Sequence, residues 1–380
     1  GGGVAAIAFS PRSHVMGGKT MKYAVVGFGT AGYHAVKKIR ELDKEGCIDV
    51  YSNTGRAPYN PMLTTYYAFG KLEYEGMFPF GDLEQIQKEV DFNLRKETVI
   101  KVHGSEHLVE TENGSEQYDR ILIATGARAF APPVKGLEPE DAFLMRTVED
   151  ALRFKDRLKK NDIKHAVVIG ASMAGIKVVE VLHKYGIETW LLDLASYIFP
   201  LAAYKEVAKE IEKRVEAQGV HLMFGVTIDH MEQENGEKTA VLTDGSRIPA
   251  DIVGLCIGTR AITDTVQGEV EIGRGIVVDD HMRTSVPGIY AAGDCCEGNN
   301  LESGQNQIIG LWANANHQGE TAGINMAGGD MAYKGNILHN ITHFMNMDFI
   351  GFGDNRMQGE VLEYGSLSED LYIRLVLDGK

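Results

Sequence analysis

The stretch Lys22–Gly32, KYAVVGFGTAG, decides the predicted fold of this 380-residue chain. It begins with Tyr23–Val26, a short and continuously apolar run of the kind that a parallel strand buried on both faces requires. A GxGxxG turn follows, whose glycines are Gly27, Gly29 and Gly32. Beyond the turn, apolar residues recur at i, i+4 and i+7 from Ala35 to Leu42, which predicts a helix.

A strand–turn–helix frame of this kind is typical of dinucleotide-binding folds. The glycines let the backbone approach a pyrophosphate closely, and the free N–H groups at the helix N-terminus meet the phosphate charge. A lone GxGxxG is weak evidence because glycine-rich turns often only pack, but the frame around this one makes the indication strong. We therefore predict a dinucleotide site at Gly27–Gly32, including Thr30 and Ala31.

A second copy of the frame begins at Lys164. An apolar strand is expected over His165–Ile169, and the turn Gly170–Gly175 leads into a helix lined by apolar residues. Ser172 replaces the middle glycine, so this copy alone would be ambiguous. Its candidate binding residues are Gly170, Ser172, Met173, Ala174 and Gly175.

The residue that ends the second strand of each frame differs between the two copies. Asp193 ends Thr189–Asp193, 23 residues after Gly170, where an acid bonds the adenosine ribose of NAD and repels the extra phosphate of NADP. No arginine stands beside it, so the spacing favours NADH over NADPH; the alternative is that Asp193 caps the next segment. In the first copy the equivalent strand ends at Asn53, a weaker acceptor for a ribose hydroxyl.

Composition excludes several classes of function. With 38 basic and 53 acidic residues the net charge is −15, which argues against nucleic acid or an anionic membrane as the main partner. The four cysteines form no CxxC pair, which fits a reducing cytoplasm rather than a disulfide-stapled secreted scaffold. No apolar run approaches the length of a membrane span.

Two further motifs lie outside the glycine turns: YDRILIATGA at 118–127 and TSVPGIYAAGD at 284–294. With the two turns in this order, they resemble the pyridine nucleotide–disulfide oxidoreductase superfamily, flavoproteins with two dinucleotide-binding domains, over about residues 21–335. Residues 58–64 and 310–319 resemble the subgroup of NADH-dependent rubredoxin, ferredoxin and nitrite reductase flavoproteins.

The resemblance implies an α/β fold of two Rossmann-like domains, the NAD domain inserted into the FAD domain. The expected boundaries are 21–137 with 266–335 for FAD, 138–265 for NAD(P)H, and 336–380 for the start of an interface domain that looks incomplete. Residues 1–20 are expected to be a cloning remnant or a disordered arm.

The resemblance also implies which residues hold the two cofactors, FAD and NADH, and no metal. For FAD they are Gly27, Gly29, Thr30, Ala31, Gly32, Asn53, Ala124, Thr125, Gly126, Gly293 and Asp294. For NADH they are Gly170, Ser172, Met173, Ala174, Gly175, Asp193 and Gly258.

The chain departs from the family pattern in two places. Disulfide reductases carry a redox cysteine in the stretch that corresponds to Pro58–Gly70, and this chain has none there, so electrons are expected to leave the flavin directly. Cys295 and Cys296, next to the predicted flavin site, are interpreted as packing residues, with a strained vicinal disulfide as the alternative. Lys177 stands where many relatives have a glutamate, and Thr65 where they have a lysine.

Lys177 is the single catalytic candidate, because a cation near the flavin would stabilise its reduced anionic form. The alternative is that Lys177 points to solvent. A basic run from Arg153 to Lys164 is interpreted mainly as a solvated helix face, with docking of an acidic electron carrier as the alternative. His339 and His343 have the spacing of metal ligands on one helix face, but no third ligand stands nearby, so they are interpreted as structural or interfacial residues.

These observations predict a cytoplasmic enzyme that passes electrons from NADH through FAD to a separate acceptor, either a protein or a small molecule. The alternative is an FAD-binding electron-transfer subunit of a larger complex with weak NADH turnover. A third reading, an oxidase that reduces dioxygen, usually needs the missing cysteine. A homodimer or a larger redox complex is expected.

Overall fold

The computed structural model describes residues 15–16 and 19–378, and these residues form two compact units. Neither unit is one continuous piece of chain. Of the described residues, unit 1 comprises 15–16, 19–60, 78–127 and 260–336, and unit 2 comprises 61–77, 128–259 and 337–378. The expected arm at 1–20 lies mostly outside the described residues, of which β1 (Val15–Met16) and β2 (Lys19–Thr20) form an antiparallel pair.

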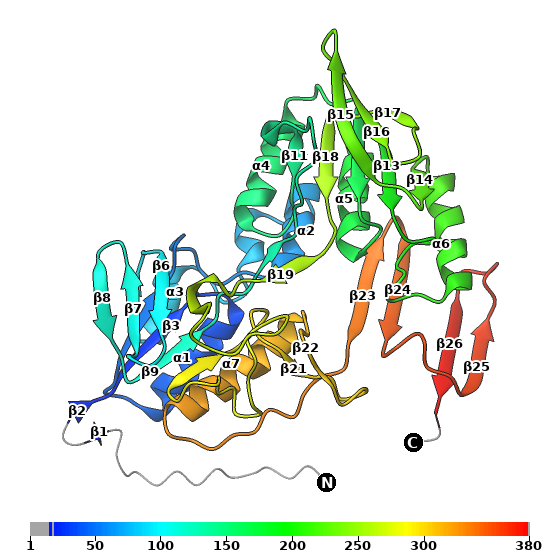
Figure 1. The fold of residues 1–380 in the computed structure, drawn as a ribbon. Coiled ribbons are helices and arrows are strands. Elements are labelled where there is room, and N and C mark those ends of the chain that lie inside the picture. The colour runs from blue at the N-terminus through cyan, green and yellow to red at the C-terminus, as the bar shows by residue number, and fades with distance from the viewer. Residues whose placement is uncertain (1–14, 17–18, 379–380) are drawn as a thin grey trace. The chain divides into compact units, whose positions relative to one another are not determined.

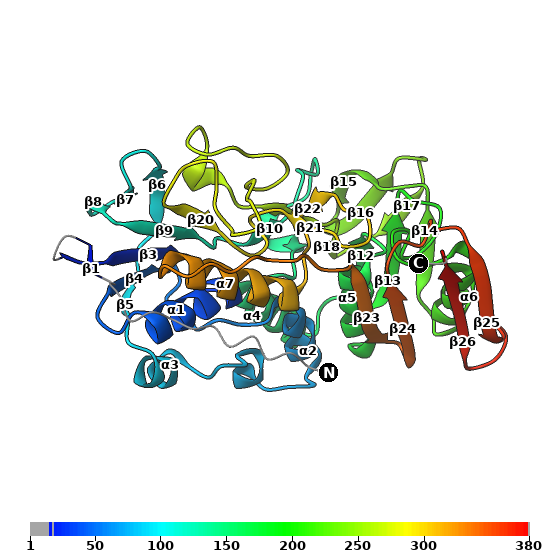
Figure 2. The same cartoon turned by 90° about the horizontal axis from the view of Figure 1, so that it is seen from below.

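Unit 1 is built on a five-stranded parallel sheet with the strand order β20-β9-β3-β4-β5 (Figure 1). The strands are β3 (Lys22–Val26), β4 (Cys47–Tyr51), β5 (Asn93–Arg95), β9 (Arg120–Ile123) and β20 (Ile289–Ala291). The helices of this unit are α1 (Thr30–Leu42), α3 (Leu83–Glu89) and α7 (Trp312–Met326). Figure 2 shows α1 and α7 side by side. They pack so closely that a Cβ at Gly319 would lie 2.3 Å from the Ala31 carbonyl oxygen.

The central strand β3 shows why its sequence is apolar at every position from Tyr23 to Val26. Tyr23 and Val25 lie in the hydrophobic cluster formed with the helices, whereas Ala24 and Val26 lie in a second cluster on the other face of the sheet. Alternate side chains of one strand are thus buried on opposite faces. The remaining elements are β6 (Val99–His103), β7 (Leu108–Thr111), β8 (Gly114–Gln117), β21 (Gly298–Asn299), β22 (Asn306–Gln307) and the 3-10 turn η4 (Asp264–Val266).

Unit 2 repeats the design with the strand order β11-β18-β12-β13-β14, all parallel. The strands are β11 (Ala142–Phe143), β12 (His165–Ile169), β13 (Glu188–Asp193), β14 (His221–Phe224) and β18 (Ile252–Leu255). The helices are α2 (Thr64–Phe69), α4 (Val148–Lys159), α5 (Met173–Lys184) and α6 (Lys205–Ala217). The strands β15 (Ile228–Glu234), β16 (Glu237–Leu242) and β17 (Arg247–Pro249) form a small antiparallel sheet. The short elements η1 (Pro61–Leu63), η2 (Tyr74–Met77) and η3 (Pro139–Asp141), with β10 (Ala127–Ala129) and β19 (Thr259–Ala261), complete the order.

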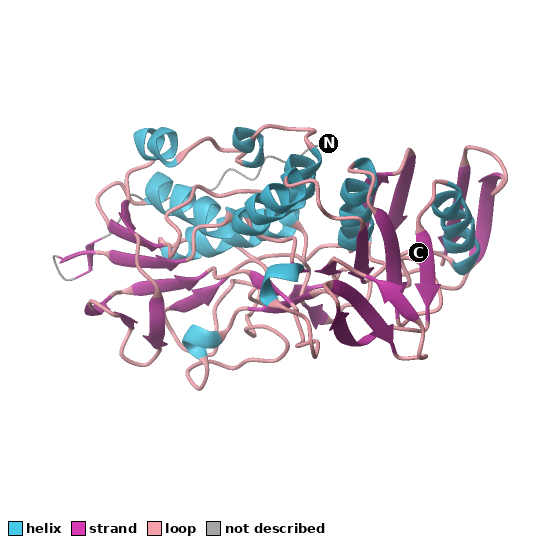
Figure 3. Ribbon diagram, turned by 90° about the horizontal axis from the view of Figure 1, so that it is seen from above, coloured by secondary structure: helices cyan, strands magenta, loops and turns pink. Residues whose placement is uncertain are grey.

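Two antiparallel hairpins end the described chain, and both appear as magenta strands in Figure 3. They are β23 (His339–Phe344) with β24 (Met347–Phe352), and β25 (Glu360–Gly365) with β26 (Tyr372–Leu377). The expected helix carrying His339 and His343 is therefore wrong. Both histidines lie on β23. The β-branched Ile341 and the aromatic Phe344 favour a strand here, whereas the four-residue spacing of the histidines alone suggested a helix.

The first hairpin completes the core of unit 2. Phe344 and Phe349 each lie 5.3 Å, centroid to centroid, from the ring of Phe199, and Phe344 is fully buried. The two parallel five-stranded sheets confirm the predicted α/β fold class with two Rossmann-like folds. The sequence-based domain boundaries stay a prediction.

Candidate functional site

The first glycine turn holds β3, β4 and β9 together at the carboxyl edge of the unit 1 sheet. Gly27 has φ +101° and donates its N–H to the Tyr51 carbonyl at 2.9 Å. A Cβ on Gly27 would stand 2.2 Å from the Ala124 carbonyl oxygen, and one on Gly32 would stand 2.3 Å from the Gly27 oxygen. Both positions therefore require glycine for the packing of the fold itself.

Gly29 is different, because its space is open. It is the N-cap of α1 with φ −82°, and a Cβ there would meet no heavy atom of the described chain within 4 Å. The cap makes no side-chain hydrogen bond, and the first turn of α1 has no acidic residue. An uncapped helix N-terminus beside an open glycine fits a pyrophosphate, whose charge the amides and the helix dipole stabilise.

The other predicted residues of this site gather at the same edge of the sheet. Thr125 follows β9 and donates its hydroxyl to the Ile262 carbonyl at 2.6 Å, and Gly126 takes φ +71°. Gly293 follows β20, and a Cβ there would lie 3.0 Å from the Cβ of Ala31 in the first turn of α1. The loops after three neighbouring strands thus meet at one place, where ligands bind in open α/β sheets.

Gln318 of α7 shapes this edge and is not among the residues predicted for the site, although it lies in the segment 310–319 that resembles the reductase subgroup. Its fully buried side chain accepts the Gly293 N–H at 2.9 Å and donates to the Glu297 carbonyl at 3.2 Å. These bonds fix the turn that carries half-buried Asp294. Asn53 is exposed two residues beyond the end of β4, so of the predicted FAD residues it is the least constrained by the fold.

The second glycine turn is built in the same way at the carboxyl edge of the unit 2 sheet. Gly170 has φ +109°, and its Cβ would lie 2.1 Å from the Cys256 oxygen. A Cβ on Gly175 would lie 1.8 Å from the Gly170 oxygen. Ser172, which replaces the middle glycine, caps α5: its hydroxyl accepts the Gly175 N–H and donates to the Cys256 carbonyl, both at 3.1 Å. The half-buried Met173 and the exposed Ala174 form the first turn of α5.

Asp193 lies at the end of β13, as its spacing predicts. One carboxylate oxygen accepts the N–H of Ala171 in the glycine turn, and the other accepts the N–H of Ala195, both at 2.8 Å. The carboxylate is therefore held beside the turn by the backbone. Gly258, at φ +98°, follows the neighbouring strand β18, and a Cβ there would meet no heavy atom of the described chain within 4 Å.

Lys177 lies in the second turn of α5 and is only 8% exposed, so the alternative that it points to solvent is wrong. Its ammonium lies 4.7 Å from the centre of the Tyr66 ring of α2 and donates to the Tyr66 hydroxyl at 3.4 Å. Thr65, the neighbouring residue on α2, is also buried. The contact with an aromatic face accounts for a buried cation at this position.

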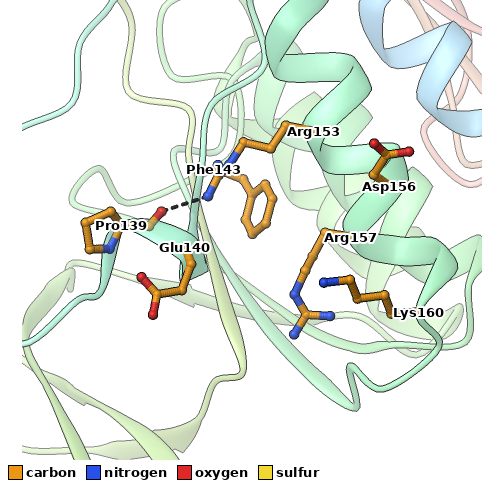
Figure 4. Close-up of a pocket in the computed structure, with 7 residues that line it drawn as sticks. All are labelled: Pro139, Glu140, Phe143, Arg153, Asp156, Arg157 and Lys160. Atoms are coloured by element: carbon orange, nitrogen blue, oxygen red, sulfur yellow. Dashed lines mark hydrogen bonds between the residues drawn. The ribbon is translucent and has the colours of Figure 1, made fainter.

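A pocket of about 740 Å³ lies beside α4 in unit 2 and contains none of the predicted site residues (Figure 4). Three cations of the basic run line it, but they already have partners or face solvent. Arg153 donates to the Ala142 and Pro139 carbonyls at 2.6 and 2.7 Å, and Arg157 forms an ion pair with Asp162. Lys160 is exposed. These contacts favour the interpretation of the run as a solvated helix face.

The four cysteines are free thiols. Burial raises the pKa of Cys256 to about 12. The buried Cys296 has its pKa raised well above the usual value by its hydrogen bond with Cys295 and by burial. Cys47 alone is partly exposed, and partial burial followed by the charge of Asp49 raises its pKa.

We expect Cys47, Cys256 and Cys296 to react slowly in the native protein at pH 8, because the thiolate is the reactive form and is scarce when the pKa is raised. The hydrogen bond with Cys296 lowers the pKa of Cys295, but this thiol should also react slowly because it is fully buried. A thiol-reactive chromophore should label Cys47 first, and Cys47→Ser should remove that phase. Four equivalents should react after denaturation without reductant. A count of two would contradict the free state of Cys295 and Cys296.

Two parallel sheets, each with a glycine turn at its carboxyl edge, define an α/β protein built on two Rossmann-like folds. The chain belongs to the pyridine nucleotide-disulphide oxidoreductase family, whose sequence profile matches residues 21–319. It is therefore an oxidoreductase of a family of flavoenzymes that bind FAD and NAD(P)H.

Individual relatives are distant. The chain is 28% identical to the NADH-dependent phenylglyoxylate dehydrogenase subunit epsilon of Aromatoleum evansii, over 90% of this chain and 82% of that protein. It is 27% identical to the 3-phenylpropionate/cinnamic acid dioxygenase ferredoxin–NAD(+) reductase component of Photorhabdus laumondii, over 82% and 78%. A NAD-dependent persulfide reductase structure from A. fulgidus matches with a TM-score of 0.82 at 26% identity, over 88% of this chain and 64% of that one.

The chain thus spans less than two thirds of the persulfide reductase. Among the helices that the structure describes, none has the length and apolar character needed to cross a lipid bilayer.

Proposed function

We propose that this protein oxidises NADH with a bound FAD and passes the electrons to a separate acceptor in the cytoplasm. The observation that supports this most is a difference between the two glycine turns. The turn of unit 1 leaves Gly29 open beside an uncapped helix N-terminus, whereas the turn of unit 2 holds the carboxylate of Asp193 beside it. An open turn without a carboxylate suits the pyrophosphate of FAD, whereas a turn with a carboxylate beside it suits NADH, whose adenosine ribose that carboxylate can bind.

The protein's part in the reaction is to bind and orient. FAD, when bound, accepts the two electrons of a hydride and can release them one at a time. The loops at Gly27–Gly32, Ala124–Gly126 and Gly293–Asp294 would hold it in unit 1. In unit 2 the turn Gly170–Gly175 would take the pyrophosphate of NADH, and Asp193 its adenosine ribose. The hydride step needs no side chain as general acid or base.

The acceptor is proposed to be separate because no cysteine occupies Pro58–Gly70, where a thiol relay would lie. Both curated relatives named above carry NADH-linked electron transfer in their names, and one is a reductase component for a ferredoxin. A protein acceptor, which may be replaced by a small molecule in the assay, is the first to test.

An anaerobic visible titration tests the proposal. The flavin bands of the purified, FAD-loaded chain should bleach rapidly with NADH and slowly with NADPH. Bands that persist under NADH but bleach with dithionite would reject it. Such a result would favour a second function, that of an FAD-binding subunit of a larger complex. Two observations support this alternative: the relative from Aromatoleum evansii is named as a subunit, and the Ser172 hydroxyl occupies the nucleotide turn.

We expect Asp193→Ala to weaken NADH binding about tenfold and to narrow the preference over NADPH, because it removes a charged ribose acceptor and a repulsive charge. The measurement is the dissociation constant of each nucleotide for the oxidised enzyme. Glu234→Ala, on the exposed end of β15, is the matched control and should change neither constant. An unchanged ratio in Asp193→Ala would remove Asp193 from the specificity argument.

We propose that the charge of Lys177 favours the reduced flavin, as its place in the family pattern implies. Lys177→Met should lower the FAD midpoint potential by on the order of 30 mV, because the reduced anion loses the stabilisation of that positive charge. Lys184→Met is the control: this lysine also lies on α5 against an aromatic ring, that of Phe69. Spectroelectrochemistry measures both. Equal shifts in the two variants would contradict the assignment.

A further inference from the structure

The starts of four neighbouring parallel strands in unit 2 each carry a residue that can bind a metal ion. In the order β18-β12-β13-β14, these residues are Asp251, directly before β18, and then His165, Glu188 and His221, each the first residue of its strand. Figure 2 shows these four strands together. This edge of the sheet is opposite the edge that carries Gly170 and Asp193.

The register places these side chains on one face of the sheet. His165 pairs with Glu188, and His221 pairs with Trp190, two residues further along β13. Asp251 donates its N–H to the His165 carbonyl at 2.9 Å, which aligns β18 with β12. The apolar core on this face includes Val167 and Leu192, and the four polar side chains begin where that core ends.

Glu188 links the two histidines directly. One carboxylate oxygen lies 3.5 Å from Nε2 of His165, and the other lies 3.0 Å from Nε2 of His221. Asp251 lies behind His165, with a carboxylate oxygen 3.9 Å from Nδ1 of that ring. The same oxygen accepts the backbone N–H groups of Lys164 and His165 at 2.9 Å, so its position is fixed.

The ring of Trp190 packs against both imidazoles. Its ring stacks on that of His221 with centroids 4.6 Å apart and 20° between the planes, and it lies 6.1 Å from the ring of His165. The side chains stay accessible: those of His165, Glu188 and His221 are 32%, 48% and 49% exposed. A solvated ion can therefore reach them.

We propose that His165, Glu188 and His221 bind a divalent transition-metal ion of the zinc type. Asp251, which lies beside Nδ1 of His165, orients that ring without contacting the ion. Imidazole and carboxylate are ligands that Zn²⁺ takes in proteins, and ligand atoms in a tetrahedral zinc site lie about 3.3 Å apart. The two nitrogen–oxygen separations are 3.5 and 3.0 Å and involve different oxygens of Glu188. The three ligand atoms do not all lie within 4.8 Å of one another, so the side chains have to rotate to enclose the ion. The two carboxylates balance the charge of the ion.

Metal-binding histidines usually have a carboxylate, a carbonyl or a water at the ring nitrogen that does not bind the metal, and His165 has such a partner. With Nε2 of His165 toward the ion, Nδ1 faces Asp251, as in carboxylate–histidine–zinc triads. The two imidazoles stand on either side of the Glu188 carboxylate, so binding draws them together by side-chain rotation, which their exposure permits. The ion would tie β12, β13 and β14 together at their first residues and stabilise unit 2 by mass action.

Zinc titration of the FAD-loaded, full-length chain, after treatment with EDTA, tests the proposal by calorimetry. We expect saturable binding of one ion. His221→Ala and the isosteric Glu188→Gln should each weaken it at least tenfold, with FAD content and circular dichroism confirming that both variants fold. The control is His281→Ala, because Asp279, Asp280 and His281 are the group in the described chain whose candidate ligand atoms all lie within 4.8 Å of one another.

Fluorescence locates the ion independently. Trp190 and Trp312 are the two tryptophans of the chain, and Ni²⁺ bound beside His221 should quench Trp190. Trp190→Phe should abolish the saturable quenching while calorimetric binding of zinc persists. The proposal is overturned if no saturable binding occurs, if His221→Ala and Glu188→Gln bind as tightly as the parent, or if His281→Ala alone removes the ion.

Discussion

Gly27→Ala should lose FAD and unfold more easily than any other single change considered for this protein. The alanine Cβ would lie 2.2 Å from the Ala124 carbonyl oxygen at a backbone φ of +101°, which L side chains rarely adopt. Because the obstacle is backbone, the turn must shift. We expect a loss of about 3–5 kcal/mol in the free energy of unfolding and about 100-fold in FAD affinity. Chemical denaturation and equilibrium dialysis of FAD measure the two effects.

Gly29→Ala is the matched control for that result. Its Cβ meets no heavy atom of the described chain within 4 Å, and its φ of −82° suits any residue. The apoprotein should lose only about 1 kcal/mol of unfolding free energy, because alanine is a poorer N-cap than glycine but meets no steric obstacle here. FAD affinity should still fall, since the methyl group occupies the space of the pyrophosphate. Unchanged FAD binding in Gly29→Ala would refute the placement of the pyrophosphate there.

Gln318→Met should destabilise unit 1 by about 2–3 kcal/mol, because a buried N–H and a partly buried carbonyl of the backbone lose their hydrogen-bond partner without any loss of side-chain volume. These groups are the Gly293 N–H and the Glu297 carbonyl. The turn that carries Asp294 should loosen, so FAD should also dissociate faster. Thermal unfolding with and without added FAD, together with the FAD release rate, measures both.

Gln87→Met on the exposed face of α3 is the control, and we expect it to change stability by less than 0.5 kcal/mol. If Gln318→Met matched that small change, the Gly293 turn would be held by other contacts. If it lowered stability without affecting FAD release, Gln318 would be a packing residue alone.

The sequence predicted the parts of this protein that local chemistry determines. Gly27, Gly32, Gly170 and Gly175 have to be glycine because of neighbouring backbone, and that requirement leaves a motif with fixed spacing. The spacing of Asp193 from the second turn likewise reflects the rise of one helix and one strand. Both sheets followed from continuous apolar runs, since parallel strands are buried on both faces.

Residues that act across long sequence separations left no such pattern. Gln318 of α7 accepts a hydrogen bond from Gly293, which lies in the turn after β20. Tyr66 accepts a hydrogen bond from Lys177, which follows it by more than one hundred residues. Neither contact changes the local spacing of its own segment. The same holds for the proposed metal ligands, which come one from each strand, so the sequence predicted no metal site. The strand at His339 was missed because a spacing of four suits a helix face and one face of a strand equally.

The interleaving of the two units has a consequence for how the protein is made. The ribosome delivers the whole nucleotide-binding sheet of unit 2, with Phe199, long before Phe344 and Phe349 emerge to cover that ring. Unit 1 likewise waits for α7, which begins at Trp312. A nascent chain stopped at residue 300 therefore exposes apolar surface in both units at once, and such surface is what chaperones bind. The hydrophobic cores of both units are thus completed only after the chain has been made as far as Phe349.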